Sequence, residues 1–163
     1  SPYIELPKKL TVKQNLIVFG KLYKIKNLND RIDYLTSKLR LSDILNRITG
    51  ELSSGQKNRA SLAKSLINDP KVLLLDEPTA SLDPEIGDFI RSFLEDYKKE
   101  KKISILLASH NMNEVTRLCK SILMMKDGII VDSGSPASLI EKHGRKNLEE
   151  VFLKLSRRPN EHN

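Results

Sequence analysis

The chain has 163 residues, 39% apolar and 30% charged, which is the composition of a globular protein and excludes a disordered chain. A single cysteine excludes an internal disulfide, and the longest apolar runs have the length of strands, so we expect no membrane-spanning helix. The net charge of +7 comes from residues 1–70, where 13 Lys and Arg face 6 Asp and Glu. Because these lysines are scattered and have no aromatic residues between them, they favour a solvated helical surface over a surface for nucleic acid, anionic lipid or an acidic partner.

Residues 1–70 are predicted to form a mainly helical part. Thr11 and Gln14 have the spacing of a capping box, and apolar residues follow at helical spacing, so a helix is expected to begin there. A second helix is expected from Asn29 or Asp30 to Arg40, with apolar residues on one face.

The segment GELSSGQK at residues 50–57 comes close to the phosphate-binding P-loop pattern G-x-x-x-x-G-K-[ST]. Its lysine stands one place late, and no Ser or Thr follows. A P-loop also follows a buried strand, whereas this segment follows a stretch with helical spacing and charge. We therefore predict that this segment is not a P-loop.

After Asp69-Pro70 the pattern changes to alternating strands and helices, which predicts an α/β layer with a partly parallel sheet. The run KVLLLDEP is expected to be a fully buried strand. The helix capped by Asp83 is expected to bury six apolar residues: Ile86, Phe89, Ile90, Phe93, Leu94 and Tyr97. The later elements are predicted as a strand at 103–109, a helix at about 111–119, a hairpin turning at Asp127-Gly128, and helices at 136–142 and 148–155.

These patterns divide the chain into three predicted parts. They are a helical subdomain at 1–70, part of an α/β catalytic core at 71–135, and C-terminal helices with a tail at 136–163.

Two acids follow the buried strand directly, at the strand end where open α/β sheets place their ligands. A buried carboxylate pair needs a compensating cation, and Mg²⁺ with oxygen ligands suits it. Asp76 is then expected to hold the metal, and Glu77 to orient and deprotonate an attacking water. The alternative is a pair of acids that meets solvent, and this alternative is favoured if the pair is considered alone.

A second buried strand ends at Ser109-His110, and parallel strands end at the same edge of a sheet. We therefore expect His110 to meet the same ligand as Glu77, although a lone histidine is more often structural. His143 and His162 lie in polar, terminal surroundings, so they receive no role. The spacing of His and Cys residues does not match a zinc site.

The motifs LSSGQ, LLLDEP, SLD and SH occur in this order, and together they resemble the ATP-binding cassette (ABC) ATPases from about Leu10 to Leu155. The segment from Asn111 to Pro136 further resembles the exporter-type subfamily that partners ABC-2 membrane subunits. The resemblance implies an α/β fold: an incomplete P-loop NTPase core of the ABC type, with a mainly α-helical subdomain at the N-terminal end.

The resemblance identifies residues 52–56 as the ABC signature, which caps the γ-phosphate of ATP held by the opposite subunit. The residues in this segment are Leu52, Ser53, Ser54, Gly55 and Gln56, and the contacts are implied for Ser53 and the amides up to Gly55. Ser54 stands where the family most often has Gly. A helix is expected to start here, with its positive end directed at the phosphate.

The other roles follow from the same resemblance. Asp76 matches the Walker B aspartate, which holds Mg²⁺ usually through water, and Glu77 matches the catalytic glutamate. His110 matches the switch histidine that contacts the γ-phosphate, and the D-loop is matched by Ser81, Leu82 and Asp83. The resemblance therefore implies ATP and Mg²⁺ as cofactors and hydrolysis of ATP to ADP and phosphate by the full-length protein.

The family's Walker A loop, adenine-stacking aromatic and Q-loop glutamine lie upstream of a position such as Ser1, so we expect the chain to be a C-terminal fragment. Micromolar to millimolar nucleotide binding is worth about 4–8 kcal/mol, and each charge-assisted hydrogen bond supplies about 1.5–3 kcal/mol of it. Without the phosphate donors of a Walker A loop, most of this affinity is missing. The chain alone is therefore expected to bind ATP very weakly and to be inactive. We also expect apolar flanks of its sheet to be exposed and to promote self-association.

The resemblance implies a second ATPase subunit and membrane-spanning transporter subunits as partners, at the cytoplasmic face of the membrane and without nucleic acid. The membrane subunits mostly set the substrate, so neither the substrate nor the direction of transport follows from this sequence. One alternative is a soluble ABC-type ATPase of DNA repair, chromosome maintenance or translation. Another is an interaction module without catalysis, which the presence of both Glu77 and His110 disfavours.

Overall fold

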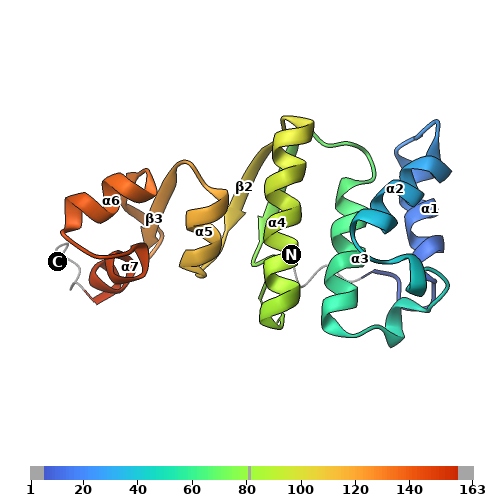
Figure 1. The fold of residues 1–163 in the computed structure, drawn as a ribbon, viewed down its shortest axis with the longest axis horizontal. Coiled ribbons are helices and arrows are strands. Elements are labelled where there is room, and N and C mark those ends of the chain that lie inside the picture. The colour runs from blue at the N-terminus through green and yellow to red at the C-terminus, as the bar shows by residue number, and fades with distance from the viewer. Residues whose placement is uncertain (1–5, 81, 158–163) are drawn as a thin grey trace. The chain divides into compact units, whose positions relative to one another are not determined.

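The computed structural model describes residues 6–80 and 82–157 (Figure 1). Its contacts divide the chain into two compact units, one within residues 1–108 and one within residues 109–163. The three-part division expected from the sequence stays a prediction. Within the described ranges, no helix is both long and apolar enough to cross a membrane.

The first half of the first unit is helical. It contains α1 (Val12–Leu22), α2 (Leu28–Lys38), two 3₁₀ turns at Ser42–Ile44 and Thr49–Glu51, and α3 (Ser54–Leu66). The capping box predicted at the start of α1 is confirmed: the Gln14 amide donates to Thr11 Oγ1 at 3.1 Å, and the Thr11 amide donates to Gln14 Oε1 at 2.9 Å. The predicted bounds of α2 were one or two residues late, because Asn27 is its N-cap.

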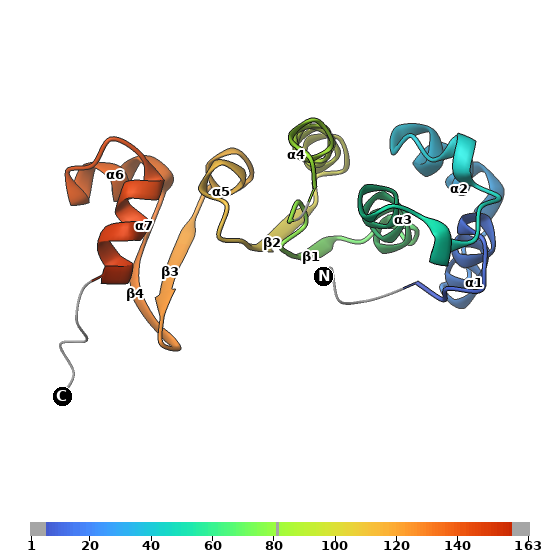
Figure 2. The ribbon, with the colours of Figure 1, turned by 90° about the horizontal axis from the view of Figure 1, so that it is seen from below.

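The helices of this unit pack through aliphatic side chains, and α3 lies between α2 and α4 (Figures 1 and 2). The side chains that are almost fully buried between the helices and turns include Leu16, Ile32, Leu35, Leu39, Leu41, Ile44 and Leu66. This core fixes α3, whose first residues carry the signature segment.

The second half of the first unit is a strand-helix-strand arrangement of β1 (Val72–Asp76), α4 (Pro84–Lys101) and β2 (Ser104–Ala108). The two strands are parallel, with Val72 opposite Ser104 and Asp76 opposite Ala108, as the sequence predicted. Asp83 caps α4, because its Oδ1 accepts a hydrogen bond from the Ile86 amide at 2.9 Å, and Pro84 occupies the first turn. Both carboxyl ends of the strands therefore lie at one edge of the sheet.

The prediction that the first strand is fully buried was wrong for the chain as described. Leu73 and Leu75 are buried, but Val72 is 58% exposed and Leu74 67% exposed, and Leu106 on β2 is 66% exposed. A parallel strand is buried on both sides only when both faces of its sheet are covered. Figure 2 shows α4 over one face of this sheet, and among the described residues nothing covers the other.

The prediction that α4 buries both of its phenylalanines was also wrong. Ile90, Leu94 and Tyr97 are buried, whereas Phe89 and Phe93 are half-buried and line a pocket beside α2. The six apolar side chains cover a wider face of α4 than the core contacts. Ile86, Phe89 and Phe93 therefore stay partly exposed.

The second unit contains α5 (Met112–Leu118), β3 (Ile122–Lys126), β4 (Ile129–Gly134), α6 (Pro136–His143) and α7 (Leu148–Arg157). The predicted hairpin is confirmed: β3 and β4 are antiparallel, and Asp127 and Gly128 both have positive φ angles, of 49° and 78°. Such angles favour Asp-Gly in a two-residue turn. Helices α6 and α7 pack on each other, and α6 also contacts β4.

A cluster of three side chains, Asp132, Lys142 and His143, links α6 to β4. The Asp132 carboxylate on β4 accepts a hydrogen bond of 2.6 Å from Lys142 Nζ and lies 2.6 Å from His143 Nε2. The His143 side chain is only 7% exposed and lies against the Asp132 carboxylate, so its surroundings are polar, as expected, but buried. His143 has a structural role. His162 lies outside the described residues.

Candidate functional site

The segment identified as the signature leads into α3 and supplies its N-cap and first residues. Leu52 is buried and anchors the segment, whereas Ser53 and Ser54 are exposed. Ser53 is the N-cap in a capping box: its Oγ accepts from the Gln56 amide at 3.3 Å, and Gln56 Oε1 accepts from the Ser53 amide at 3.0 Å. The spacing Ser-x-x-Gln, which was not among the features predicted above, is the sequence signal for this cap.

This helix start suits an anion. The first amides of an α-helix have no acceptor within the helix, and the helix dipole places partial positive charge there. Ser53 Oγ serves the cap as an acceptor, so its hydroxyl proton is still available to an external oxygen. The α3 N-terminus therefore offers a hydroxyl donor and backbone donors from one exposed turn.

Packing does not require glycine at position 55. A Cβ built there would lie 3.7 Å from Ile86 Cγ2 and 4.0 Å from Leu82 Cδ2, which are ordinary contact distances, and Gly55 does not have a positive φ angle. A glycine that neither the backbone nor the packing demands is consistent with close approach of a ligand to the chain.

The two acids predicted to be functional lie where the sequence placed them, at the carboxyl end of β1. Asp76 is the last residue of the strand and is exposed, and Glu77 follows it half-buried. The Glu77 backbone has a φ angle of 48°, in the left-handed region, and its amide donates to the Ala108 carbonyl at 2.9 Å. This conformation costs a non-glycine residue about 1–2 kcal/mol and is enriched at functional sites.

The signature helix is attached directly to the loop that follows Glu77. Asn58 Nδ2 on α3 donates a hydrogen bond of 2.7 Å to the carbonyl oxygen of Pro78. The same loop is closed by a hydrogen bond of 3.1 Å from the Ala80 amide to the Glu77 carbonyl. The first unit thus brings the signature segment and the acidic loop side by side, although 20 residues separate Asn58 from Pro78.

The segment predicted as the D-loop continues from this acidic loop. Leu82 is half-buried, close to where a Gly55 side chain would lie, and Asp83 is exposed. Ser81 lies outside the described residues. The Asp83 carboxylate already caps α4, so this residue has a structural task whichever further contact it makes.

His110 belongs to the second unit, where it is exposed between Ser109 and the N-cap of α5, Asn111. Ser109 Oγ donates to Glu114 Oε2 at 2.7 Å and accepts from the Asn111 amide at 3.1 Å. Glu114 is fully buried. These contacts fix the turn that carries His110. Glu114 was not predicted from the sequence, since an acid within an amphipathic helix gives no distinct signal. The predicted meeting of His110 with the Glu77 ligand stays a prediction.

The described residues fit the expected mode of magnesium binding. Residues 6–80 and 82–157 contain no group of three or more His, Cys, Asp or Glu side chains that forms a protein-only metal site. Magnesium typically uses one or two carboxylates together with waters and nucleotide phosphates. An exposed carboxylate at a strand end, as Asp76 provides, matches that requirement.

The chain is similar to known ATP-binding proteins of transport systems. The family described as ABC transporter matches residues 3–80. The ABC transporter ATP-binding protein NatA of Bacillus subtilis (strain 168) is 35% identical over 147 residues, which are 89% of this chain and 59% of NatA. The Nod factor export ATP-binding protein I of Rhizobium sp. (strain N33) is 37% identical over 149 residues, 90% of this chain and 49% of that protein. The chain therefore spans about half to three fifths of these relatives.

The fold agrees as well. The structure of cbiO1 from Clostridium perfringens, described as part of the ABC transporter complex cbiONQ, matches with a TM-score of 0.70 and 32% identity. The match covers 90% of this chain and 59% of cbiO1. A TM-score of 0.70 shows that the two chains share a fold, so the predicted fold class is confirmed. These matches support identification of the chain as part of an ABC-type ATPase.

Proposed function

We propose that this chain is part of the nucleotide-binding subunit of an ABC transporter, which couples ATP binding and hydrolysis to transport through a membrane partner. The observation that carries the proposal is the contact between α3 and the acidic loop, where Asn58 binds Pro78 at 2.7 Å. It joins a helix start suited to phosphate with the pair Asp76 and Glu77 in one unit.

In the proposed mechanism each residue has one task. The Ser53 hydroxyl and the first amides of α3 bind the γ-phosphate of ATP held by a second subunit. Glu77 orients the attacking water and accepts its proton, and His110 donates to the same phosphate. Asp76 holds Mg²⁺, usually through water, and the ion neutralises phosphate charge when it is bound.

The proposed roles of these residues determine which partners the chain requires. Because the signature segment would act on nucleotide held by another subunit, the proposal requires a second ATPase subunit. The relatives named above are ATP-binding proteins of transport systems, and cbiO1 is part of a transporter complex, which supports a membrane partner over a soluble ABC ATPase. We accordingly propose a position at the cytoplasmic face of a membrane, held there by the transporter subunits.

We further propose that the 163-residue chain alone binds ATP very weakly and does not hydrolyse it at a useful rate. The donors described above come from one helix turn, whereas micromolar to millimolar nucleotide affinity corresponds to about 4–8 kcal/mol. Calorimetry of the isolated chain with Mg-ATP is expected to give no saturable binding at micromolar concentrations. Low-micromolar affinity would contradict this part of the proposal.

The central experiment measures phosphate release by the full-length protein. Glu77→Gln keeps the size of the side chain and removes its basicity, so the rate is expected to fall by about 10²–10⁴-fold. Glu149→Gln, the same change at an exposed position of α7, is the matched control and is expected to leave the rate unchanged. Full activity of the Glu77→Gln protein would rule out the proposed catalytic role.

The proposed role in transport has its own test. A reading frame beside the full-length gene that encodes about six apolar spans of roughly 20 residues would supply the membrane partner. Copurification of that product with the ATPase is expected, and its absence together with nucleic-acid-stimulated hydrolysis would favour the soluble alternative.

A further inference from the structure

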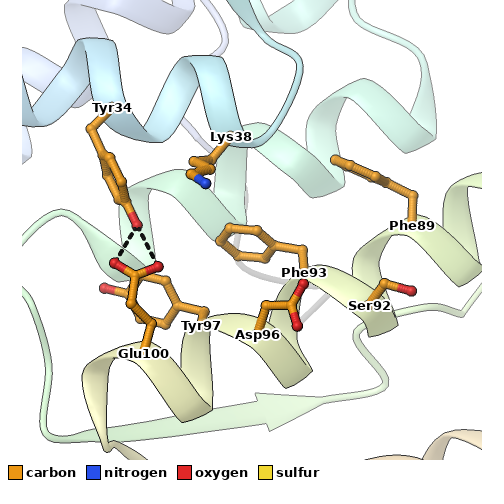
Figure 3. A pocket seen from close by; sticks show the side chains of 8 residues that line it. All are labelled: Tyr34, Lys38, Phe89, Ser92, Phe93, Asp96, Tyr97 and Glu100. Carbon is orange, nitrogen blue, oxygen red and sulfur yellow. Dashed lines mark hydrogen bonds between the residues drawn. The ribbon is translucent and has the colours of Figure 1, made fainter.

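A pocket of about 210 Å³ lies between α2 and α4, and no residue of the signature segment lines it (Figure 3). Tyr34 and Lys38 of α2 form one wall, and α4 forms the other with Phe89, Ser92, Phe93, Asp96, Tyr97 and Glu100. Four of the eight Tyr and Phe residues of the whole chain therefore meet in one place. The proposed ATPase function does not use this pocket.

The aromatic rings around this pocket already attract cations of the chain itself. The Arg40 guanidinium lies 4.3 Å from the centre of the Phe89 ring. The Tyr34 ring has Arg31 at 5.4 Å, Lys101 at 5.5 Å and Lys38 at 6.0 Å. These distances are within the range of cation–π attraction, so the local chemistry favours positive groups over ring faces.

Among the described residues, the Phe93 ring and the Asp96 carboxylate of the pocket have no cation beside them. Phe93 contacts the Tyr97 ring at 5.6 Å, but no Lys or Arg from the described parts of the chain lies over it. Asp96, three residues after Phe93 on α4, has no ion pair or hydrogen bond with any described residue. Figure 3 shows Asp96 and Phe93 on the same wall of the pocket, both from α4.

A second carboxylate stands one helical turn further along. Glu100 accepts hydrogen bonds from the Tyr34 hydroxyl at 3.2 and 3.4 Å, and burial together with Glu100 raises the pKa of Tyr34, which keeps this hydroxyl a donor. Side chains four residues apart on a helix are neighbours, so Asp96 and Glu100 flank one stretch of the pocket.

We propose that this pocket binds a single arginine side chain presented by a partner protein. A guanidinium is planar, stacks on aromatic rings and donates in a fork to carboxylates, which matches Phe93 beside Asp96 better than the compact ammonium of lysine does. Lys38 on the opposite wall repels further positive charge. The site therefore selects one arginine and disfavours a polybasic segment.

The experiment is a titration of the isotopically labelled 163-residue chain, followed by the backbone amide NMR shifts of residues 34–38 and 89–100. The probe is Nα-acetylarginine N-methylamide, and the matched ligand is the citrulline analogue, which has the same shape without the charge. We expect the arginine probe to give saturable shifts confined to these two segments, and the citrulline analogue to bind at least about twofold more weakly. No nucleotide is present, so the result does not depend on the ATPase proposal.

Three variants and one control make the assignment specific. Asp96→Asn and Phe93→Leu are each expected to weaken binding of the arginine probe about two- to fivefold, since each removes one charged or aromatic contact. Lys38→Gln is expected to tighten binding, because it removes the opposing charge. Glu85→Gln makes the same charge change as Asp96→Asn three turns away on α4, and it is expected to have no effect.

The outcomes against the proposal are equally definite. Equal affinity for the arginine and citrulline probes would overturn it, as would shifts spread evenly over the surface. Unchanged binding in Asp96→Asn would also overturn it, and this variant is expected to fold, because Asp96 is exposed. Lys38→Gln is expected to bind the arginine probe more tightly. Such a gain in affinity cannot result from loss of structure.

Discussion

The carbonyl oxygen of Pro78 accepts a hydrogen bond of 2.7 Å from the Asn58 side chain, and this bond links the helix of the signature segment to the loop beside Glu77. In the proposed dimer, Ser53 serves the ATP of the other subunit while Glu77 serves the subunit's own. The Asn58 bond is thus a direct physical link between residues that act at two different nucleotides.

Asn58→Asp tests this link, because it removes the donor at constant size and places a negative charge against a carbonyl oxygen. We expect the full-length protein to lose about 1–3 kcal/mol of stability and to show a lower kcat, with a smaller change in KM for ATP. Asn46→Asp makes the same chemical change at an exposed position and is the control. Thermal unfolding and steady-state kinetics measure the two effects, and unchanged kinetics would show that the bond is dispensable.

Ser53→Asp separates the two tasks of the signature serine. Aspartate is as good an N-cap as serine, so the stability of α3 is expected to be retained, whereas its charge repels a phosphate. Ser53→Ala is the complementary change: it removes the cap and is expected to lower the free energy of unfolding by about 1 kcal/mol.

Phosphate release by the full-length protein is expected to fall more than about tenfold in Ser53→Asp, since even a single charge-assisted contact is worth at least about 1.4 kcal/mol. An active Ser53→Asp protein would contradict contact between this residue and the nucleotide.

Glu77→Gly is expected to change stability and activity in opposite directions. Glycine adopts the left-handed backbone at residue 77 without strain, so the free energy of unfolding of the chain should rise by up to about 1 kcal/mol after the larger chain entropy of glycine is subtracted. Hydrolysis by the full-length protein should be abolished together with the carboxylate. Urea denaturation provides the stability measurement, and a loss of stability would show that the Glu77 side chain makes a net favourable contribution that exceeds the strain.

The Asp132 cluster predicts an acid-sensitive second unit. Hydrogen bonds from Lys142 and His143, opposed by partial burial, lower the pKa of Asp132 from 3.8 to about 2. A lowered pKa means that this stabilisation is present above pH 4 and is lost as the pH falls from about 4 to about 2.

We expect Asp132→Asn to lower stability at pH 7 by about 1 kcal/mol, after discounting the full shift for screening by solvent, and to remove that part of the acid sensitivity. Thermal unfolding at pH 7 and pH 3 measures both. The variant and the parent chain should converge near pH 2, and a constant difference at every pH would refute the role of the ionised carboxylate.

The exposed face of the β1–β2 sheet predicts self-association of the 163-residue chain. Leu74 and Leu106 are each about two thirds exposed on paired positions of neighbouring strands. Leu74→Lys places a charge on this face without disturbing the core, so it is expected to reduce the average mass measured by light scattering at high concentration. A parent chain that remains monomeric under the same conditions would count against the prediction.

The sequence predicted most of the local structure because its signals are local. The Thr11 capping box, the Asp83-Pro84 helix start and the Asp127-Gly128 turn depend on residues a few positions apart, and all three were confirmed. The parallel pairing of β1 with β2 also followed from the order of strands and helices. Such features need no knowledge of what packs against them.

The remaining features depend on contacts distant in sequence. No local pattern indicates that Asn58 reaches Pro78, or that α6 turns His143 toward Asp132. The same holds for exposure: Leu74 lies in an apolar run that is typical of a strand covered on both faces, and only the arrangement of the described elements shows one face bare. The positive φ angle of Glu77 is likewise unexpected, because glutamate has no preference for it.

The capping box of α3 makes the Gln56 amide a natural reporter. This amide donates to Ser53 Oγ in the first, exposed turn of the helix, where hydrogen bonds open readily and amide protons exchange with solvent. A phosphate that engages the Ser53 hydroxyl can leave the cap intact, since one oxygen accepts from Gln56 and donates outward at once. Hydrogen–deuterium exchange at the Gln56 amide should therefore slow when nucleotide bridges two subunits. The exchange rate would report closure of the proposed dimer without any label attached to the protein.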